Sequence, residues 1–310
     1  MRHLIFALIM LLSMSLSAQS VGTDITLTTS TGDIHGTLLL PVDVDKPSVV
    51  LIISGSGPTD RDGNNPMMSN NSLRMFAEDL QAGGIASVRF DKRGVAASMD
   101  AAPEEIEMRF DHYVDDVRQW VELLAQDDRY SSIILAGHSE GALIATLVAQ
   151  SPQVDRLITL AGAGTTADET IRAQLAGQPA MVADPALRLL DSLAAGRTVE
   201  NVPPMLMSIF RPSVQPYMIS WFQYDPAMEL AKLDKPVLII QGSTDIQVKA
   251  ADADRLAAAL PSAQLSHIDG MNHVLKPAPM DMTANVATYS DPVLPLHEKL
   301  MDVILEFLSF

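Results

Sequence analysis

Ser139 is the residue of this sequence best placed to act as a nucleophile. It stands at the centre of Gly137-His138-Ser139-Glu140-Gly141, between the apolar runs SIILA and ALIATLVA. A serine with a glycine two residues away on each side, between a buried strand and a helix, is typical of a strained turn that exposes the hydroxyl. The sequence therefore predicts a nucleophilic serine, and the alternative is a plain turn with a small polar residue.

Two further residues have the types and the chain order that such a serine needs. A serine hydroxyl is a weak nucleophile, so a base must accept its proton and an acid must orient that base. Asp245 in LIIQGSTDIQV and His273 in HIDGMNHVLK each follow a predicted strand, in the order serine, acid, histidine. Loops at the carboxyl ends of parallel strands gather at one edge, so we expect Ser139, Asp245 and His273 to form a catalytic triad.

The sequence also contains alternatives for the base and the acid. His267, within a predicted strand, is the leading alternative base. Asp252 and Asp254 lie on a predicted helix whose charged side is expected to be solvated, and Asp225 belongs to a different segment. The triad above is therefore the first choice.

Acyl transfer requires two donors for the oxyanion that develops on the carbonyl oxygen. The backbone N–H of Glu140, directly after the serine, is the first candidate. The second is expected in SGSGP, the loop after the apolar run SVVLIIS, where we predict the N–H of Ser56, with Gly57 as the alternative.

The same loop continues as TDRDGNNP, in which Asp60, Asp62 and Asn64 alternate as in the start of a calcium loop. Such a loop needs glycine at its sixth position and glutamate at its twelfth, and here Gly63 comes too early and Asn71 replaces the glutamate. We therefore expect a hydrogen-bonded Asx turn, and no metal site.

Strand-like and helix-like stretches alternate over most of the chain, which predicts a mostly parallel sheet covered by helices on both faces. The predicted strands span 24–29, 34–40, 48–54, 85–91, 132–137, 156–162, 236–242 and 263–269. The predicted helices include 72–82, a stretch around 110–124, DADRLAAAL and a final helix over 294–308. Residues 21–162 and 234–310 thus form the predicted core.

Residues 163–233 interrupt this alternation with helical segments and many prolines, which predicts a helical cap insertion. Met207, Phe210 and Phe222 in this insertion are candidates to line an adaptable apolar acyl pocket. The same side chains are equally well explained as the cap's own core.

The composition excludes several classes of function. With 38 acidic and 21 basic side chains, the formal net charge is −17, so no basic surface is available for nucleic acid or anionic membranes. The absence of cysteine excludes disulfides, a thiolate nucleophile and cysteine-ligated metals. A small molecule is therefore the expected partner, and the oligomeric state is left open.

Residues 1–20, MRHLIFALIMLLSMSLSAQS, predict a secretory signal peptide. Basic residues precede an apolar run that is short for a membrane span, and small residues follow it. Cleavage near Ala18 would leave no stable membrane anchor and would place the protein in the periplasm or outside the cell. An uncleaved amphipathic or anchoring helix is the alternative.

Several stretches together resemble the α/β-hydrolase superfamily, specifically exported esterase-like hydrolases of the serine aminopeptidase-like branch: SGSGPTDRDGNN, RFDKRGVAAS, LAGHSEGALIA, LIIQGSTDIQV and GMNHVLK. The resemblance implies the α/β-hydrolase fold, with an eight-stranded, mostly parallel sheet and a helical cap over its catalytic end. It also implies the triad of Ser139, Asp245 and His273 and hydrolysis without a cofactor. The usual His-Gly start of the oxyanion loop is replaced here by Ser54-Gly55.

We therefore expect a serine carboxylesterase that forms a covalent acyl-enzyme with small or medium acyl groups. An aminopeptidase or amidase with the same triad is the alternative enzyme. A non-catalytic binding protein is the alternative from another class, although such proteins commonly lose a triad member and none is missing here.

Overall fold

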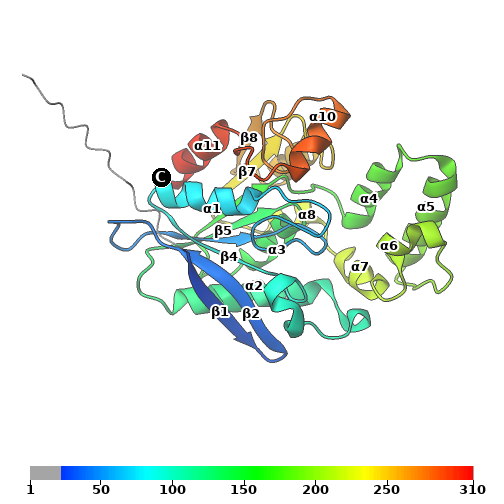
Figure 1. The fold of residues 1–310 in the computed structure, drawn as a ribbon, viewed down its shortest axis with the longest axis horizontal. Helices are drawn as coiled ribbons and strands as arrows, with labels where there is room; N and C mark the ends of the chain where they lie inside the picture. Colours follow the sequence, from blue (N-terminus) through cyan, green and yellow to red (C-terminus); the bar gives the residue numbers. More distant parts are fainter. Residues whose placement is uncertain (1–21, 310) are drawn as a thin grey trace, which may run out of the picture.

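The computed structural model describes residues 22–309, and the predicted signal peptide, residues 1–20, lies outside the described residues (Figure 1). Within 22–309, eight strands form one sheet in the order β1-β2-β4-β3-β5-β6-β7-β8. The strands are β1 (Thr23–Thr29), β2 (Gly32–Leu39), β3 (Val49–Ile53), β4 (Ala86–Phe90), β5 (Ile133–His138), β6 (Arg156–Leu160), β7 (Val237–Gly242) and β8 (Gln264–Ile268). Each strand lies where the sequence predicts one.

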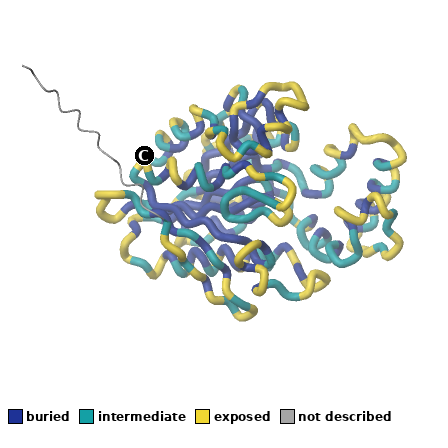
Figure 2. Tube along the Cα trace, viewed as in Figure 1, coloured by how far each residue is buried: buried dark blue, intermediate teal, exposed yellow. Residues whose placement is uncertain are grey.

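The sheet is parallel from β4 across to β8, and the β1–β2 hairpin extends it with antiparallel pairing at the β4 edge. All residues of β3, β4, β5 and β7 are buried, as expected for parallel strands covered on both faces. Figure 2 shows this buried sheet at the centre of the molecule. The predicted mostly parallel, eight-stranded sheet is therefore confirmed.

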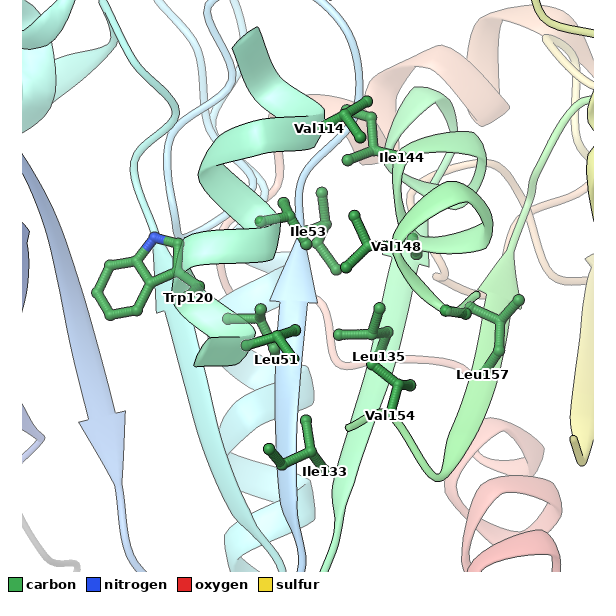
Figure 3. Close-up of a cluster of buried hydrophobic side chains, with 14 of the residues drawn as sticks. Leu51, Ile53, Val114, Trp120, Ile133, Leu135, Ile144, Val148, Val154 and Leu157 are labelled. Carbon is green, nitrogen blue, oxygen red and sulfur yellow. The ribbon is translucent and has the colours of Figure 1, made fainter. Parts of the chain in front are cut away.

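Helices cover both faces because alternate residues of each strand point in opposite directions. Leu51 and Ile53 of β3 face one layer, where Figure 3 shows them packed with Trp120 and Ile144. Val50 of β3 belongs to the core on the other face. The first layer contains α2 (Phe110–Ala125), α3 (Glu140–Val148), α8 (Pro226–Leu230) and α9 (Ala250–Ala259); the second contains α1 (Ser72–Ala82) and α11 (Lys299–Leu308).

Between β6 and β7 the described chain forms helices and no strand. They are α4 (Ala167–Leu175), α5 (Ala180–Ala194), η3 (Pro204–Leu206), α6 (Met207–Phe210), α7 (Gln215–Trp221) and α8. Helices α4 to α7, here called the cap, enclose a separate hydrophobic core and stand to one side of the sheet (Figure 1). Helix α8 instead packs into the main core through Ala227 and Leu230. The predicted domain limits at 163 and 233 remain predictions.

The final helix begins at Lys299, not at residue 294. Asp291 explains the difference, because its carboxylate accepts hydrogen bonds from the N–H groups of Val293 and Leu294 and holds this stretch in a turn. The sequence patterns also gave no sign of α10 (Met282–Ala287) or of the short helices η1 (Ala96–Ala101), η2 (Glu105–Glu107) and η4 (Thr288–Ser290). Among residues 22–309, no helix has the length and apolar character needed to cross a membrane.

Candidate active site

Ser139 sits on the sharp turn between β5 and α3. Its φ of 55° and ψ of −120° are strained for a residue with a side chain. A Cβ on Gly137 would lie 2.1 Å from the carbonyl oxygen of Gly141, and a Cβ on Gly141 would lie 2.4 Å from that of Ile53. Both glycines are therefore required for the turn that presents Ser139.

Asp245 and His273 form a buried pair on the loops that follow β7 and β8. His273 Nδ1 lies 2.8 Å from Asp245 Oδ2, and the N–H groups of Gln247 and Val248 donate to Oδ1 of the same carboxylate. Burial by itself raises the pKa of Asp245, but His273 and these N–H groups outweigh it, so the pKa is lowered. The carboxylate is therefore held ionised, as an acceptor for Nδ1–H of His273.

The loop that carries His273 is tied down by its neighbour Asn272. The fully buried Asn272 side chain donates to Thr288 Oγ1 at 2.7 Å and to Asn285 Oδ1 at 3.2 Å. Its own carbonyl oxygen, Oδ1, accepts from the N–H of Lys276. The otherwise unpredicted helices α10 and η4 thus supply the residues that position this loop.

His138, next to the serine, also supports His273. Its Nε2 donates to the carbonyl oxygen of His273 at 2.7 Å, and the two rings lie 4.9 Å apart. Burial, helped by the proximity of His273, lowers the pKa of His138 to about 4. His138 is therefore a neutral structural donor, and no local pattern in the sequence indicates its contact with His273.

Ser139 lines a cavity of about 580 Å³ between the sheet and the cap. Ser56, Gly57 and Glu140 line the same cavity, whereas His273 and Asp245 are buried and do not line it. Apolar walls come from both parts of the molecule and include Met108, Leu143, Ile171, Ile209, Met218 and Trp221. No hydrogen bond joins the Ser139 hydroxyl to His273 within the described residues.

Both predicted sources of oxyanion donors reach this cavity. Glu140 is the first residue of α3, so its N–H has no acceptor within the helix and lies at the positive end of the helix dipole. The loop after β3 passes close to the nucleophile, since a Cβ on Gly55 would lie 3.1 Å from Cβ of Ser139. Ser56 and Gly57 therefore both remain candidates for the second donor.

The prediction that Met207, Phe210 and Phe222 line the pocket is corrected by their positions. Phe210 and Phe222 are buried in the core of the cap, and Met207 is 42% exposed. None of the three lines the cavity. Phe222 lies just beyond α7, whereas Met218 and Trp221 within α7 line the cavity.

The alternative acid and base residues are engaged elsewhere. His267 Nε2 contacts Asp254 Oδ1 at 2.9 Å, and both side chains are exposed. Asp225 caps α8 and pairs with Arg255, while Asp252 accepts from the N–H of Gly164. None of these side chains contacts Ser139 or lines its cavity.

The aspartates of TDRDGNNP shape the loop, and the predicted Asx turn is confirmed. Asp60 Oδ1 accepts from the N–H groups of Asp62 and Asn64 at 2.9 and 2.8 Å. The Asp62 carboxylate pairs with Arg89 of β4 at 2.8 Å. In the part of the chain that the structure describes, no group of three or more His, Asp or Glu side chains is arranged to hold a metal ion.

A polar cluster around Glu140 was missed by sequence reasoning. The hydroxyl of Tyr217, from α7 of the cap, donates to Glu140 Oε1, and burial together with this carboxylate raises the pKa of Tyr217 well above its ordinary value. Lys92, buried just after β4, donates to the carbonyl oxygen of Gly55 and lies over the ring of Tyr113 at 5.0 Å. A charged residue at a buried strand end, in RFDKRG, was the available signal.

Comparison with known proteins gives one family and several relatives. The sequence profile described as serine aminopeptidase, S33, matches residues 68–230, more than half of the chain. The chain is 23% identical over 253 residues to Esterase EstD of Thermotoga maritima, a match that covers 77% of this chain and 57% of that protein. The chain thus spans little more than half the length of this curated relative.

Solved structures share the fold over nearly the whole chain. Est1E from Butyrivibrio proteoclasticus, with ferulic acid bound, has a TM-score of 0.62 at 18% identity and covers 92% of this chain and 100% of its own. The hydrolase GrgF from Penicillium sp. sh18 has a TM-score of 0.61 at 16% identity, over 94% and 98%. The Pyrococcus furiosus esterase Pf2001 has a TM-score of 0.60 at 19% identity, over 93% and 91%. At these sequence identities, the similarity shows a shared fold and no more.

Proposed function

Because the chain belongs to the S33 serine aminopeptidase family of α/β hydrolases, we propose that it is a serine hydrolase that cleaves carboxylic esters of small or medium acyl groups. The observation that carries the proposal is the buried Asp245–His273 pair, which lies beside the strained turn that bears Ser139. The esterases among the relatives and structural neighbours support ester hydrolysis as the reaction.

In the proposed first step, the hydroxyl oxygen of Ser139 attacks the ester carbonyl carbon. Its proton passes to Nε2 of His273, which is free to accept because Nδ1–H is committed to Asp245. The carbonyl oxygen becomes an oxyanion and receives hydrogen bonds from the N–H of Glu140 and from that of Ser56 or Gly57. Asp245 orients the ring and stabilises the imidazolium that forms.

The tetrahedral intermediate then collapses. The alcohol leaves with the proton from His273 Nε2, and the acyl group stays on Ser139 as an ester. A water molecule gives a proton to His273 and attacks this ester, and the carboxylic acid departs as Ser139 regains its proton. The open Ser139–His273 hydrogen bond is compatible with this sequence, since such bonds are often long before substrate binds. The reaction requires no cofactor.

The size and lining of the cavity support the proposal that it holds a small or medium acyl group of the ester. Its volume of about 580 Å³ falls in the range of small-molecule sites, and most of its named walls are apolar. Leu143 from the core and Met218 and Trp221 from the cap all line this cavity. The cap is thus proposed to set the acyl length and the core to perform the chemistry.

A second candidate, cleavage of aminoacyl amides, is favoured by Glu140. Glu140 lines the cavity, and its Oε2 is buried without a hydrogen-bond partner among the described residues. A carboxylate is the group expected to receive a substrate ammonium. A panel of p-nitrophenyl esters and aminoacyl p-nitroanilides separates the two activities: the first proposal requires the higher kcat/KM with the esters.

A fluorophosphonate probe tests the nucleophile directly. We expect one adduct, at Ser139, in the folded protein, and a rate of labelling that falls strongly in His273→Ala, because the serine then lacks its base. Asp254→Asn is a matched control, since it changes a carboxylate that pairs with another histidine outside the site. Adduct formation at another residue, or equal labelling of His273→Ala, would falsify the mechanism.

Export is also proposed, on the pattern of residues 1–20. The expected locations are the periplasm or the extracellular space. Mass spectrometry of the protein recovered from its native host tests this proposal: a mature N-terminus close to residue 19 is expected, and an intact Met1 with the following residues would contradict it.

A further inference from the structure

Lys92 is a buried lysine that takes no part in the proposed reaction steps. Its side chain is 2% exposed, and it follows β4, the strand beside β3. Burial lowers the pKa of Lys92, and the carboxylate of Glu140 opposes that shift. Burying a lysine in such a position is costly, so the hydrogen bond that its ammonium group makes within residues 22–309 is informative.

That hydrogen bond ends on the loop expected to supply an oxyanion donor. Lys92 Nζ donates to the carbonyl oxygen of Gly55. This carbonyl and the N–H of Ser56 belong to one peptide group, which is planar and trans, so the two point in opposite directions. An anchor on the Gly55 oxygen therefore fixes the direction of the Ser56 N–H.

The Gly55–Ser56 peptide group lies close to Ser139, so the direction of the Ser56 N–H matters for the reaction. Gly55 passes so close to Ser139 that an added Cβ would lie 3.1 Å from the serine Cβ, and Ser56 and Ser139 line one cavity. We propose that Lys92 is a positioning residue that holds the Gly55–Ser56 peptide group with the Ser56 N–H directed at the substrate oxyanion. This inference rests on the proposed serine hydrolase function.

The hydrogen bond acts in two ways. It keeps the peptide plane from rotating, so the donor is oriented before substrate binds. It also draws electron density toward the Gly55 oxygen, which makes the N–H of the same amide a stronger donor. The Ser56 N–H, rather than that of Gly57, is therefore the second oxyanion donor.

Glu140 and Tyr217 complete the arrangement. Glu140 supplies the first oxyanion donor through its backbone, and its carboxylate is the charge that acts on Lys92. Tyr217 of the cap donates to the same carboxylate. The Glu140 carboxylate has no role in the reaction steps of ester hydrolysis. Its negative charge balances Lys92, which aligns the Ser56 donor.

Kinetics of Lys92→Met test the proposal, with p-nitrophenyl butyrate as substrate and butylboronic acid as a mimic of the tetrahedral intermediate. We expect kcat to fall on the order of tenfold to a hundredfold, below the effect of deleting a donor outright, with KM within about threefold. The inhibition constant of the boronic acid should rise by the same factor by which kcat falls. A merely structural lysine would not produce this matched loss.

Lys235→Met is the matched control. Lys235 also donates its ammonium protons to backbone carbonyls, those of Ser151 and Val154, but it lies before β7 and outside the cavity. Its removal should leave kcat and boronic acid binding unchanged. Unchanged kcat in Lys92→Met, or an equal loss in Lys235→Met, overturns the proposal while leaving the serine hydrolase function intact.

The boronic acid complex of the wild-type protein gives a test that needs no variant. A crystal structure should place a boronate oxygen within about 3 Å of both Glu140 N and Ser56 N, with Lys92 still on the Gly55 oxygen. Contact with Gly57 N in place of Ser56 N overturns the inference. Absence of both turnover and adduct in the wild-type protein overturns the proposed function and this inference with it.

Discussion

The core and the cap contribute to the surroundings of Ser139 in different ways. In the core, Asp245 and His273 come from loops of the sheet, and the Asp245 carboxylate is bonded to His273, Gln241 and two backbone N–H groups. The cap reaches the core through side chains, with Tyr217 on Glu140 and the ring of Trp221 stacked on Phe110. The proposed catalytic pair of Asp245 and His273 is thus held by many hydrogen bonds, whereas the separately packed cap contributes Met218 and Trp221 to the cavity wall.

Removing the base should produce the largest effect of all. In His273→Ala, kcat for p-nitrophenyl butyrate should fall roughly 10⁶-fold, because the base proposed for the proton of Ser139 is then missing. Asp245→Asn should cost about 10⁴-fold, because the ring then loses its preferred tautomer. Melting temperatures report whether either variant is misfolded. If a folded His273→Ala variant keeps even a tenth of the activity, His273 is not the base.

Truncating a buried phenylalanine should test whether the two hydrophobic cores are independent. Phe76→Ala on α1 and Phe210→Ala in the cap each remove a fully buried ring, so each should cost about 3–5 kcal/mol in its own region. Hydrogen exchange should rise throughout the sheet in Phe76→Ala but only within 167–222 in Phe210→Ala. If hydrogen exchange in β3 and β5 rose equally in both variants, core and cap would unfold as one unit.

His138 should make the core sensitive to acid in a way that the cap is not. Burial lowers its pKa from 6.5 to about 4, so between these values the unfolded chain binds a proton that the folded protein does not. Stability from this group is complete above about pH 6.5 and declines as the pH falls to about 4, by a total of ~3 kcal/mol.

The difference between the wild type and His138→Asn isolates this contribution. Urea unfolding from pH 7 to pH 4 should show a shallower loss of stability in the variant, since asparagine does not titrate. Only the slopes against pH are compared, because the variant also loses the hydrogen bond to His273. Parallel slopes would show that His138 is protonated equally in both states.

The smallest expected effect is on the preference for acyl-chain length. It distinguishes Met218 in α7 from Phe222, which follows that helix. Met218 lines the cavity and Phe222, one turn later, does not, although both are buried. Met218→Ala should raise the kcat/KM ratio of octanoyl to butyryl ester about tenfold by enlarging the pocket, whereas Phe222→Ala should destabilise the cap with that ratio unchanged. A changed ratio in Phe222→Ala alone would restore the role predicted for it from sequence.

Local patterns were sufficient for the residues of the core. Strands buried on both faces read as continuous apolar runs, so β3 to β7 could be located to within a residue or two. The turn at Ser139 is forced by two glycines that are visible in the sequence, and Asp245 and His273 follow strands that are equally visible. The triad remains a prediction of function, but the proximity of Asp245 and His273 could be anticipated because parallel strands end at one edge.

The sequence by itself thus determined the sheet, the turn and the order of the candidate catalytic residues, because each depends on local periodicity and on strand order. Only the tertiary structure decided which cap residues face the cavity, since a helix that packs on both sides looks apolar all round. It alone also brought Lys92 to Gly55 and Tyr217 to Glu140. These contacts join residues distant in the chain, and no local pattern encodes which buried polar groups will meet.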